Sequence, residues 1–286
     1  MEKQAVQNKV DFAVTVRVDG GNPNGDPGAE NYPRSDEEGY GSIEDVCLKR
    51  KIRNRMMANG NPVFVQSEDK RQDDYGSLSA RAKARFDAIA AKKRQADGEK
   101  KAEPLSRDEQ YQAACETWLD VRAFGNVFSY KNKGVETFGI RGPVTVRPAK
   151  SVAPIKVREV EITKSVNGDD GEKRGSDTMG TKYRVEENIY VFYGSVHPEL
   201  AAKTSFSADD LEELRKTLCT LFEGDASSSR PDGSMEVVNV IWWQHSCPLG
   251  DLSSAKLQRS LTVNLDGSFA IDQIDGAPKP EILEGF

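Results

Sequence analysis

The sequence predicts an α+β fold, in which strands and helices follow one another along the chain. Residues 10–18 alternate apolar and polar side chains, which is the pattern of a strand. Residues 207–222 place leucines at helical spacing after Ser207 and Asp210, which form a helix cap. Further strand-like runs, rich in β-branched and aromatic residues, lie at 136–146, 155–163, 182–196 and 236–246.

Length and composition indicate a polar, water-soluble protein. The 286 residues are enough for one elaborated domain or two small ones. Charged residues make up 30% of the chain, the mean hydropathy is -0.64, and the longest apolar run, 237–243, is far shorter than a membrane span. The first ten residues lack the apolar stretch of a signal peptide. We therefore expect a cytoplasmic protein that makes no membrane contact.

The cysteines predict neither a metal centre nor a disulfide framework. Cys47, Cys115, Cys219 and Cys247 lie far apart in the sequence and form no CxxC pair. We expect them to be buried as small apolar side chains, and we expect no cofactor.

The first strand and the first helix have clear apolar faces. In residues 10–18 one face holds only Val and Phe and the other holds Asp, Ala, Thr and Arg, so a half-buried strand is expected. Ser42–Met57 is expected to form a helix with its first residue as the N-cap. Leu48, Ile52 and Met56 have the spacing of its core-facing side.

A charged, Ala-rich stretch from 66 to 117 interrupts this pattern. Within it, "ARAKARFDAIAAKKRQA" predicts an amphipathic helix, and Ser106 with Glu109 has the spacing of a capping box. We expect an inserted helical subdomain with a loop near Gly98.

The second half of the chain adds strands and a polar protrusion. The strand at 136–146 is expected to kink at Gly142–Pro143. Residues 164–181 are too polar and glycine-rich to pack, so they predict the tip of a protruding hairpin. Without the insertions, the order is strand, helix, strand, strand, helix, strand, which is the ferredoxin-like plan shared by RNA-recognition domains.

The segment "DGGNPNGDP" (19–27) follows the first strand and admits several interpretations. An EF-hand calcium loop needs oxygen ligands at its first and last positions, which here are Gly20 and Asn31. Asn-Gly and Asp-Pro are also turn dipeptides. A simple turn leaves unexplained why the segment rich in Gly, Pro and Asn continues to about Gly41, since loops of that length are usually functional or disordered.

Charge is distributed unevenly along the chain. The net charge of -6 argues against nucleic-acid binding through bulk charge. In the first helix, however, Lys49 and Arg53 share one face with Arg50 nearby, which fits a phosphate-binding face or a solvated helix face. Lys51 and Arg55 point elsewhere and are expected to be surface or subunit-interface charges.

Aromatic residues in the predicted strands are expected to serve packing. Tyr190 and Phe192 share one face of a strand, with Tyr193 on the other, so at least one of the two faces belongs to the core. Trp242 and Trp243 are likewise expected to be packing or interface residues.

Five separate stretches carry a resemblance to a known family: "NPNGDP" at 22–27, "YGSIEDVCLKRKIRN" at 40–54, "DVRAFG" at 120–125, "FGIRGPV" at 138–144 and "MGTKYRVEENIYVFYG" at 179–194. Together they resemble the backbone subunit of type I CRISPR Cascade complexes, most closely the type I-C form. They are spread over nearly two-thirds of the chain in the family's order. The charged insertion and the chain beyond Cys247 match poorly.

The resemblance implies one elaborated RNA-recognition domain (1–286) shaped like a hand. Its palm carries the sheet, and a helical insertion (60–118) forms the fingers. A protruding β-hairpin (148–182) forms the thumb, and residues 247–286 form a C-terminal extension.

The implied function is a non-catalytic backbone that polymerises head to tail along a CRISPR guide RNA (crRNA) and presents it for pairing. The implied partners are the crRNA, the target DNA strand paired to it, further copies of the chain, other Cascade subunits and the helicase-nuclease recruited to the complex.

The resemblance also implies an RNA-binding surface. The glycine-rich loop lies against the guide, the basic helix face binds phosphates, and the thumb inserts a wedge that displaces a base at regular intervals. Two arginines can each bind a phosphate or anchor a local carboxylate. The residues are Asn22, Asn24 and Gly25 in the loop, Lys49, Arg50 and Arg53 on the helix, Thr178 and the wedge Met179 on the thumb, and the two arginines Arg122 and Arg141.

Two other functions stay open. Backbone subunits of related type III complexes cut RNA with a loop Asp, so Asp26 or Asp36 would serve a metal-dependent ribonuclease. A stand-alone RNA-binding regulator is the other alternative. His197 and His245 are the only histidines and neither lies in a nucleophile or metal motif, so no enzymatic activity is expected.

Overall fold

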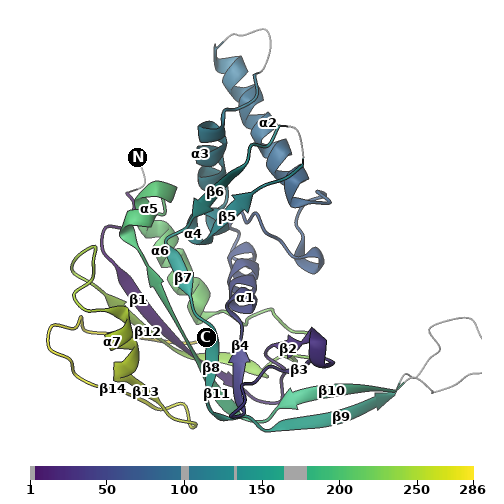
Figure 1. Cartoon of the computed structure of the whole chain (residues 1–286), viewed down its shortest axis with the longest axis vertical. Coiled ribbons are helices and arrows are strands. Elements are labelled where there is room, and N and C mark those ends of the chain that lie inside the picture. Colours follow the sequence, from purple (N-terminus) through teal and green to yellow (C-terminus); the bar gives the residue numbers. More distant parts are fainter. Residues whose placement is uncertain (1–3, 98–102, 132–133, 164–178) are drawn as a thin grey trace, which may run out of the picture.

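Helices and strands are arranged around one large antiparallel sheet (Figure 1). The structure, a computed structural model, describes residues 4–97, 103–131, 134–163 and 179–286. Within these residues the sheet has seven strands, and all its paired strands are antiparallel, which confirms the predicted mixture of helices with an antiparallel sheet. The strands lie in the order β15 (Glu281–Glu284), β12 (Met235–Gln244), β1 (Val10–Val18), β11 (Asn188–Val196), β8 (Ala149–Pro154) and β4 (Tyr40–Ile43), and β7 (Val144–Val146) also pairs with β11.

The chain contains the predicted order of strand, helix, strand, strand, helix and strand, although the strand β8 lies between the runs expected at 136–146 and 155–163. After β1 come α1 (Asp45–Ala58), then β8 and β11, then α6 (Ala208–Cys219) and β12. In the sheet β12, β1, β11 and β8 are consecutive. Val14 at the centre of β1 lies opposite Phe192 of β11 and Val240 of β12, so the longest strands are in register.

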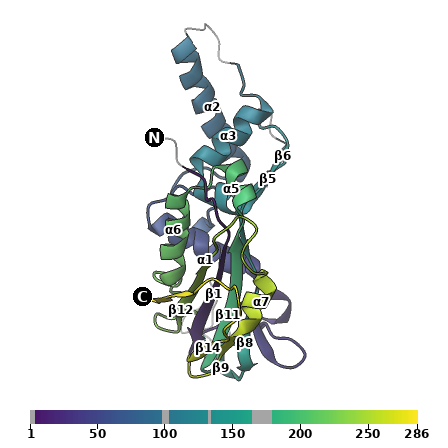
Figure 2. The ribbon, with the colours of Figure 1, turned by 90° about the vertical axis from the view of Figure 1, so that its left-hand side faces the viewer.

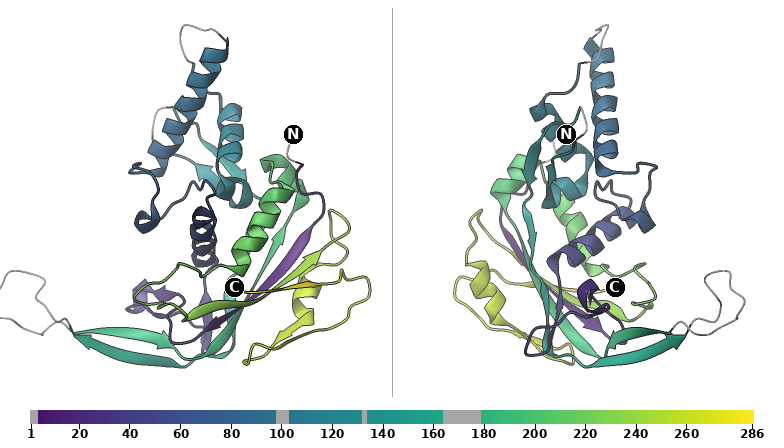
Figure 3. Two further views of the ribbon diagram at one scale, coloured as in Figure 1. Left: turned by 180° about the vertical axis from the view of Figure 1, so that it is seen from behind. Right: turned by 45° about the vertical axis from the view of Figure 1, so that its right-hand side comes forward.

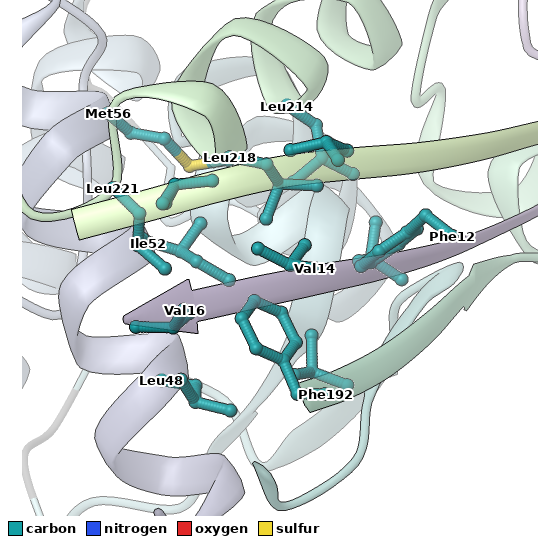
Figure 4. Packing of buried hydrophobic residues seen from close by; sticks show 14 of the residues in the cluster. Phe12, Val14, Val16, Leu48, Ile52, Met56, Phe192, Leu214, Leu218 and Leu221 are labelled. Atoms are coloured by element: carbon teal, nitrogen blue, oxygen red, sulfur yellow. The ribbon is translucent and has the colours of Figure 1, made fainter. Parts of the chain in front are cut away.

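Helices α1 and α6 cover one face of this sheet. The predicted core residues Leu48, Ile52 and Met56 are fully buried. They extend from α1 toward Val14 and Val16 of β1, and leucines of α6 complete the layer (Figure 4). The helical spacing in the sequence therefore identified the buried side of α1.

The first helix begins later than the sequence predicts. Tyr40–Ile43 forms the edge strand β4, which pairs with β8, so Ser42 is not the N-cap. The N-cap is Glu44, and its backbone N–H donates to Oδ1 of Asn24 over 2.9 Å. Pairing with the sheet thus overrides the local capping signal, as tertiary contacts commonly do.

The C-terminal segment covers the opposite face of the sheet, and α6 and α7 (Ser254–Ser260) lie on opposite sides of the strands (Figure 2). It also contributes the hairpin of β13 (Leu261–Val263) and β14 (Phe269–Ile271), packed on side chains such as Trp243. The prediction of a half-buried first strand is therefore wrong. Every residue of β1 except Arg17 is buried, because both faces of the sheet are covered.

The helical insertion has a hydrophobic core of its own at one end of the molecule (Figure 3). Phe64, Phe86, Trp118 and Phe128 meet there, and the core continues as far as Ile140, beyond the expected 60–118. Its elements are α2 (Leu78–Asp97), α3 (Arg107–Thr117), α4 (Leu119–Phe124), β5 (Gly125–Phe128) and β6 (Phe138–Arg141).

Two local predictions near this insertion are confirmed. Ser106 caps α3 in a reciprocal capping box, in which Glu109 Oε2 accepts from the Ser106 N–H over 2.8 Å. The run 136–146 breaks at Gly142, since β6 pairs with β5 whereas β7 joins the main sheet. A Cβ at Gly142 would lie 2.3 Å from the carbonyl oxygen of Ala123, so the break requires glycine.

A two-stranded arm projects from the base of the sheet (Figure 1). It consists of β9 (Val157–Thr163) and β10 (Met179–Val185), and we call this pair the arm. The short strands β2 (Gly25–Asp26) and β3 (Tyr32–Pro33) lie beside its base. Most of the predicted polar tip, 164–178, lies outside the described residues.

Packing predictions for single side chains have mixed outcomes. The aromatic residues Tyr190, Phe192, Trp242 and Trp243 are buried, as the packing interpretation predicts. Among the cysteines only Cys115 is buried, so the expectation of burial is wrong for Cys47, Cys219 and Cys247, which are partly exposed. In the part of the chain that the structure describes, no helix is long and apolar enough to cross a membrane.

Candidate functional site

The candidate residues lie in three places: the loop between β1 and β4, helix α1, and the arm. In the loop, the predicted contact residues are engaged in shaping the loop itself. Asn22 is 5% exposed, and its Nδ2 donates to the carbonyl oxygen of Asn31 over 2.7 Å. Asn24 Oδ1 accepts a hydrogen bond from the backbone N–H of Glu44, the N-cap of α1. A Cβ at Gly25 would lie 2.8 Å from that same Asn31 oxygen, so this glycine permits the loop to fold onto itself.

On α1, Lys49 and Arg50 are partly open to solvent. Lys49 Nζ lies 2.9 Å from Oδ2 of Asp45, one helical turn earlier, with 27% of the side chain exposed. Arg50 donates one guanidinium N–H to the carbonyl oxygen of Val65 over 2.7 Å. Burial, and then the charge of Arg53, lowers the pKa of Arg50. Both side chains keep donors that a phosphate can use, since each forms a single hydrogen bond with the residues that the structure describes.

Arg53 instead joins α1 to the helical insertion. Its Nε donates to Oδ2 of Asp120 over 2.9 Å, and its guanidinium lies 5.2 Å from the ring centre of Phe124. Asp120 is fully buried and also accepts from the backbone N–H groups of Phe64 (2.7 Å) and Val65 (3.1 Å). Because the buried Asp120 carboxylate accepts hydrogen bonds from both α1 and residues 64 and 65, it holds α1 against the helical insertion.

Of the two remaining basic residues of α1, Lys51 differs from the prediction. It was expected as a surface or subunit-interface charge, but it is 6% exposed and forms an ion pair with Asp225. Arg55 is partly exposed and donates from Nε to Oγ1 of Thr220 over 2.8 Å. The helical wheel ignores the loop after α6, which packs on this side and supplies both partners.

The two arginines with alternative roles have different surroundings. Arg122 binds both carboxylate oxygens of Asp210, over 2.9 and 2.8 Å, and is 13% exposed. This is the local-carboxylate alternative, and it fastens α4 to the capped start of α6. Arg141, the last residue of β6, is exposed, and among the described residues no hydrogen bond or ion pair involves its side chain. Arg141 therefore has its guanidinium available to a ligand.

On the arm, Met179 is the first residue of β10 and is 65% exposed. Its neighbour Thr178 lies outside the described residues. Strand pairing places the arm's charges on different faces, because Met179 pairs with Thr163 and side chains alternate along each strand. One face holds Met179, Thr181 and Tyr183 with Glu159 and Glu161, and the other holds Gly180, Lys182 and Arg184 with Arg158, Val160 and Ile162.

The carboxylates of the ribonuclease alternative have partners within the loop. Asp26 caps a short turn through the N–H of Gly28 (3.0 Å) and lies 3.4 Å from Arg34. Asp36 lies 2.7 Å from Lys150, and the hydrogen bond from Lys150 lowers the pKa of Asp36. Both line a hollow of about 370 Å³ beside Tyr32. In the residues that the structure covers, no three His, Cys, Asp or Glu side chains are grouped so as to hold a metal ion.

Both histidines lie in surroundings typical of residues that stabilise the fold. His245 is buried, and its Nδ1 accepts from the N–H of Asp251 over 2.9 Å, so its Nε2 is the donor to Asp11 at 2.9 Å. His197 is the N-cap of α5 (Pro198–Thr204), and burial lowers its pKa. The His245 ring, hydrogen-bonded through both nitrogens, anchors the C-terminal segment to β1.

Sequence reasoning missed the carboxylates that hold the basic residues. Asp120 and Asp225 determine the positions of Arg53 and Lys51, and Asp210 binds Arg122 besides capping its own helix. The available signal was an acid among apolar residues, as in "LDV" around Asp120. The arrangement as a whole offers cationic donors to a polyanion, from α1, Arg141 and the arm.

Comparison with known proteins gives a consistent result. The family model described as "CRISPR-associated protein Cas7" matches residues 8–277. A protein of Haloferax volcanii described as "CRISPR-associated protein Cas7" is 28% identical over 282 residues, and the match covers 89% of this chain and 79% of that protein.

Two solved structures also match at low identity. A chain of a "CRISPR RNA-guided surveillance complex, pre-nicking" has a TM-score of 0.49 at 15% identity, covering 82% of this chain and 77% of that one. A chain of a "CRISPR RNA-guided surveillance complex" has a TM-score of 0.42 at 13% identity, covering 82% and 68%.

Proposed function

Because the chain belongs to the Cas7 family of CRISPR-associated proteins, we propose that it is the guide-RNA-binding backbone subunit of a CRISPR RNA-guided surveillance complex of the Cascade type. The observation that carries this proposal is the family match, which runs through the sheet, the helical insertion and the arm. The five stretches that resemble the type I-C form support assignment to that subtype.

In this function the sheet with α1 and α6 is the palm of an RNA-recognition fold, the helical insertion around 60–118 is the fingers, and the hairpin within 148–182 is the thumb. The C-terminal extension (247–286) closes the second face of the sheet. RNA-recognition domains commonly bind bases on an open sheet face. Since both faces are covered here, the RNA lies along the loop, α1 and the arm instead.

Within that surface the candidate residues divide into two roles. Lys49, Arg50 and Arg141 have donors open to solvent and bind phosphates, which contributes affinity without sequence preference. Met179 acts as the exposed wedge, with Thr178 beside it. Arg53, Arg122, Asn22, Asn24 and Gly25 hold this surface in shape, and the loop backbone approaches the guide.

The partners follow from this role. Copies of the chain assemble head to tail on the crRNA in the cytoplasm, beside other Cascade subunits. The guide then pairs with a target DNA strand, and a helicase-nuclease is recruited to the assembled complex.

The proposed subunit performs no chemistry of its own. The competing ribonuclease would use Asp26 or Asp36, which both line the hollow in the loop. With purified protein, magnesium and a paired RNA, we expect no cleavage. Cleavage that disappears in Asp26→Ala or Asp36→Ala would establish the ribonuclease instead.

The assembly itself is tested by expressing the chain with a guide RNA and imaging the product by negative-stain electron microscopy. Regular, RNA-length-dependent assemblies are expected. One-to-one complexes at every RNA length would favour the stand-alone RNA-binding regulator.

A further inference from the structure

The arm extends into solvent with little support along its length. Its two strands pair with each other and form a sheet separate from the main one. None of the residues of β9 is buried, and in β10 only Val185 is. Whatever fixes the direction of the arm must therefore act at its base.

At that base, the loop between β1 and β4 binds β10 through backbone hydrogen bonds and a ring contact. The N–H of Gly20 donates to the carbonyl oxygen of Val185 over 2.9 Å, and the N–H of Val185 donates to the carbonyl oxygen of Gly21 over 2.8 Å. The ring of Tyr32 meets the ring of Tyr183 edge-on, with centroids 5.0 Å apart and planes at 61°. Tyr183 lies two residues further out along the arm than the hydrogen-bonded Val185, so the ring contact resists rotation about that attachment.

Contacts within the loop hold Tyr32 in position against Tyr183. The Asn22 side chain bonds to the carbonyl of Asn31, and Asp26 pairs with Tyr32 in the β2–β3 ladder. Asn31 itself has a φ of 63°, in the left-handed region that Asn tolerates. The contacts therefore form a continuous connection from the start of α1, through Asn24, to the arm.

We propose that Tyr32 and Tyr183 are positioning residues that set the direction of the arm relative to α1, and thereby the spacing of successive copies along the RNA. The consequence for spacing rests on the proposed function, whereas the contact itself does not. A ring contact, rather than a hydrogen bond, carries the effect, because among the described residues neither tyrosine hydroxyl has a hydrogen-bond partner.

The first test uses the free protein and hydrogen exchange at the amides of Gly20 and Val185. In Tyr183→Ala both amides should exchange up to about tenfold faster, which corresponds to the loss of one edge-on aromatic pair. Tyr183→Phe should retain the parent rates because it keeps the ring. Tyr75→Ala removes a tyrosine that is 41% exposed in the insertion, far from the arm, and is the matched control.

The second test compares the same variants on RNA. At protein concentrations that saturate the RNA, Tyr183→Ala should form assemblies with irregular spacing in electron micrographs. Tyr183→Phe should restore regular spacing.

Unchanged amide exchange in Tyr183→Ala, or faster amide exchange in Tyr183→Phe, would show that the ring contact does not hold the arm in place. Regular assemblies of Tyr183→Ala would overturn its role in spacing. If the parent chain does not assemble on RNA, the proposed function and the role in spacing fail together. The hydrogen-exchange measurement still shows whether the ring contact holds the arm in place.

Discussion

Charged residues in the body and in the arm of this protein have different surroundings and different uses. In the body, Arg53, Arg122 and Lys51 each meet a carboxylate that is at most 10% exposed. In the arm, Arg158 is 70% exposed, and its ion pair with Glu186 spans 3.4 Å between two exposed side chains. Buried pairs are costly to break, whereas exposed pairs contribute little to stability. By this criterion, the basic residues that remain candidates for RNA contact are those without a buried partner.

The largest expected effect comes from breaking a buried pair in the body. Arg53→Ala leaves Asp120 buried without its cation, which should lower the free energy of unfolding by about 3–5 kcal/mol. Urea unfolding measures this change. Arg85→Ala removes an exposed arginine that donates to Thr117 and should cost less than about 0.5 kcal/mol. Equal losses in the two variants would abolish the distinction between buried and exposed charges.

A smaller loss of stability is expected at low pH, from protonation of Asp11 in its buried hydrogen-bond network. Burial acts to raise the pKa of Asp11, but hydrogen bonds from His245, Ser195 and Ser254 and the charge of Lys9 outweigh it and lower the pKa from 3.8 to about 2. The carboxylate therefore stabilises the fold above pH 3.8, by about 2 kcal/mol, and this stability is lost as the pH falls through about 2.

Unfolding measured between pH 4 and pH 2 tests this sign. The parent should lose stability across that window, and Asp11→Asn should show a shallower dependence. An Asp11→Asn variant with the same pH dependence as the parent would assign the acid sensitivity to other carboxylates.

On α1, Lys49 should act on RNA affinity with little effect on stability. Its partner Asp45 is 34% exposed, so the pair is readily exchanged for a phosphate. Lys49→Ala should reduce the steepness of the log–log salt dependence of single-strand binding by about 0.7. Lys279→Ala, an exposed lysine on the C-terminal segment, should leave the slope unchanged. An unchanged slope in Lys49→Ala would place Lys49 outside the RNA surface.

The smallest effect on stability is expected at the arm. Met179→Ala should change the free energy of unfolding by less than about 0.5 kcal/mol, since the side chain is 65% exposed. If Met179 is the wedge, chemical probing of the bound guide should show hyper-reactive bases at regular intervals in the parent and not in the variant. Ile162→Ala, on the opposite face of the arm, should keep the pattern. A uniform pattern with the parent chain would rule out the wedge.

How much the sequence could predict differs between the core and the candidate site. The period-2 pattern of β1 and the helical spacing of Leu48, Ile52 and Met56 identified core residues correctly. Each pattern depends only on which side of a single strand or helix packs against its neighbour. The capping box of Ser106 and the break at Gly142 were also readable, since each is a local event.

The partners of the basic residues were not readable in the same way. Arg53 and Asp120 are 67 residues apart, and Arg122 and Asp210 are 88 apart. Periodicity describes which side of an element a residue occupies, but it does not tell which distant segment packs there. The five basic side chains of α1, Lys51 among them, were therefore assigned to a phosphate-binding, solvated or interface surface without knowledge of what covers it.

The sequence by itself determined the mixed fold, the order of its strands and helices, the buried side of α1, and the membership in a family that its scattered motifs resemble. The tertiary structure decided that the C-terminal segment covers the second face of the sheet, which arginines are held by buried carboxylates, and that the glycine-rich loop supports the base of the arm. The physical reason is range: propensity, periodicity and capping act within a few residues, whereas a buried ion pair or an edge-on ring contact exists only once distant segments have packed together.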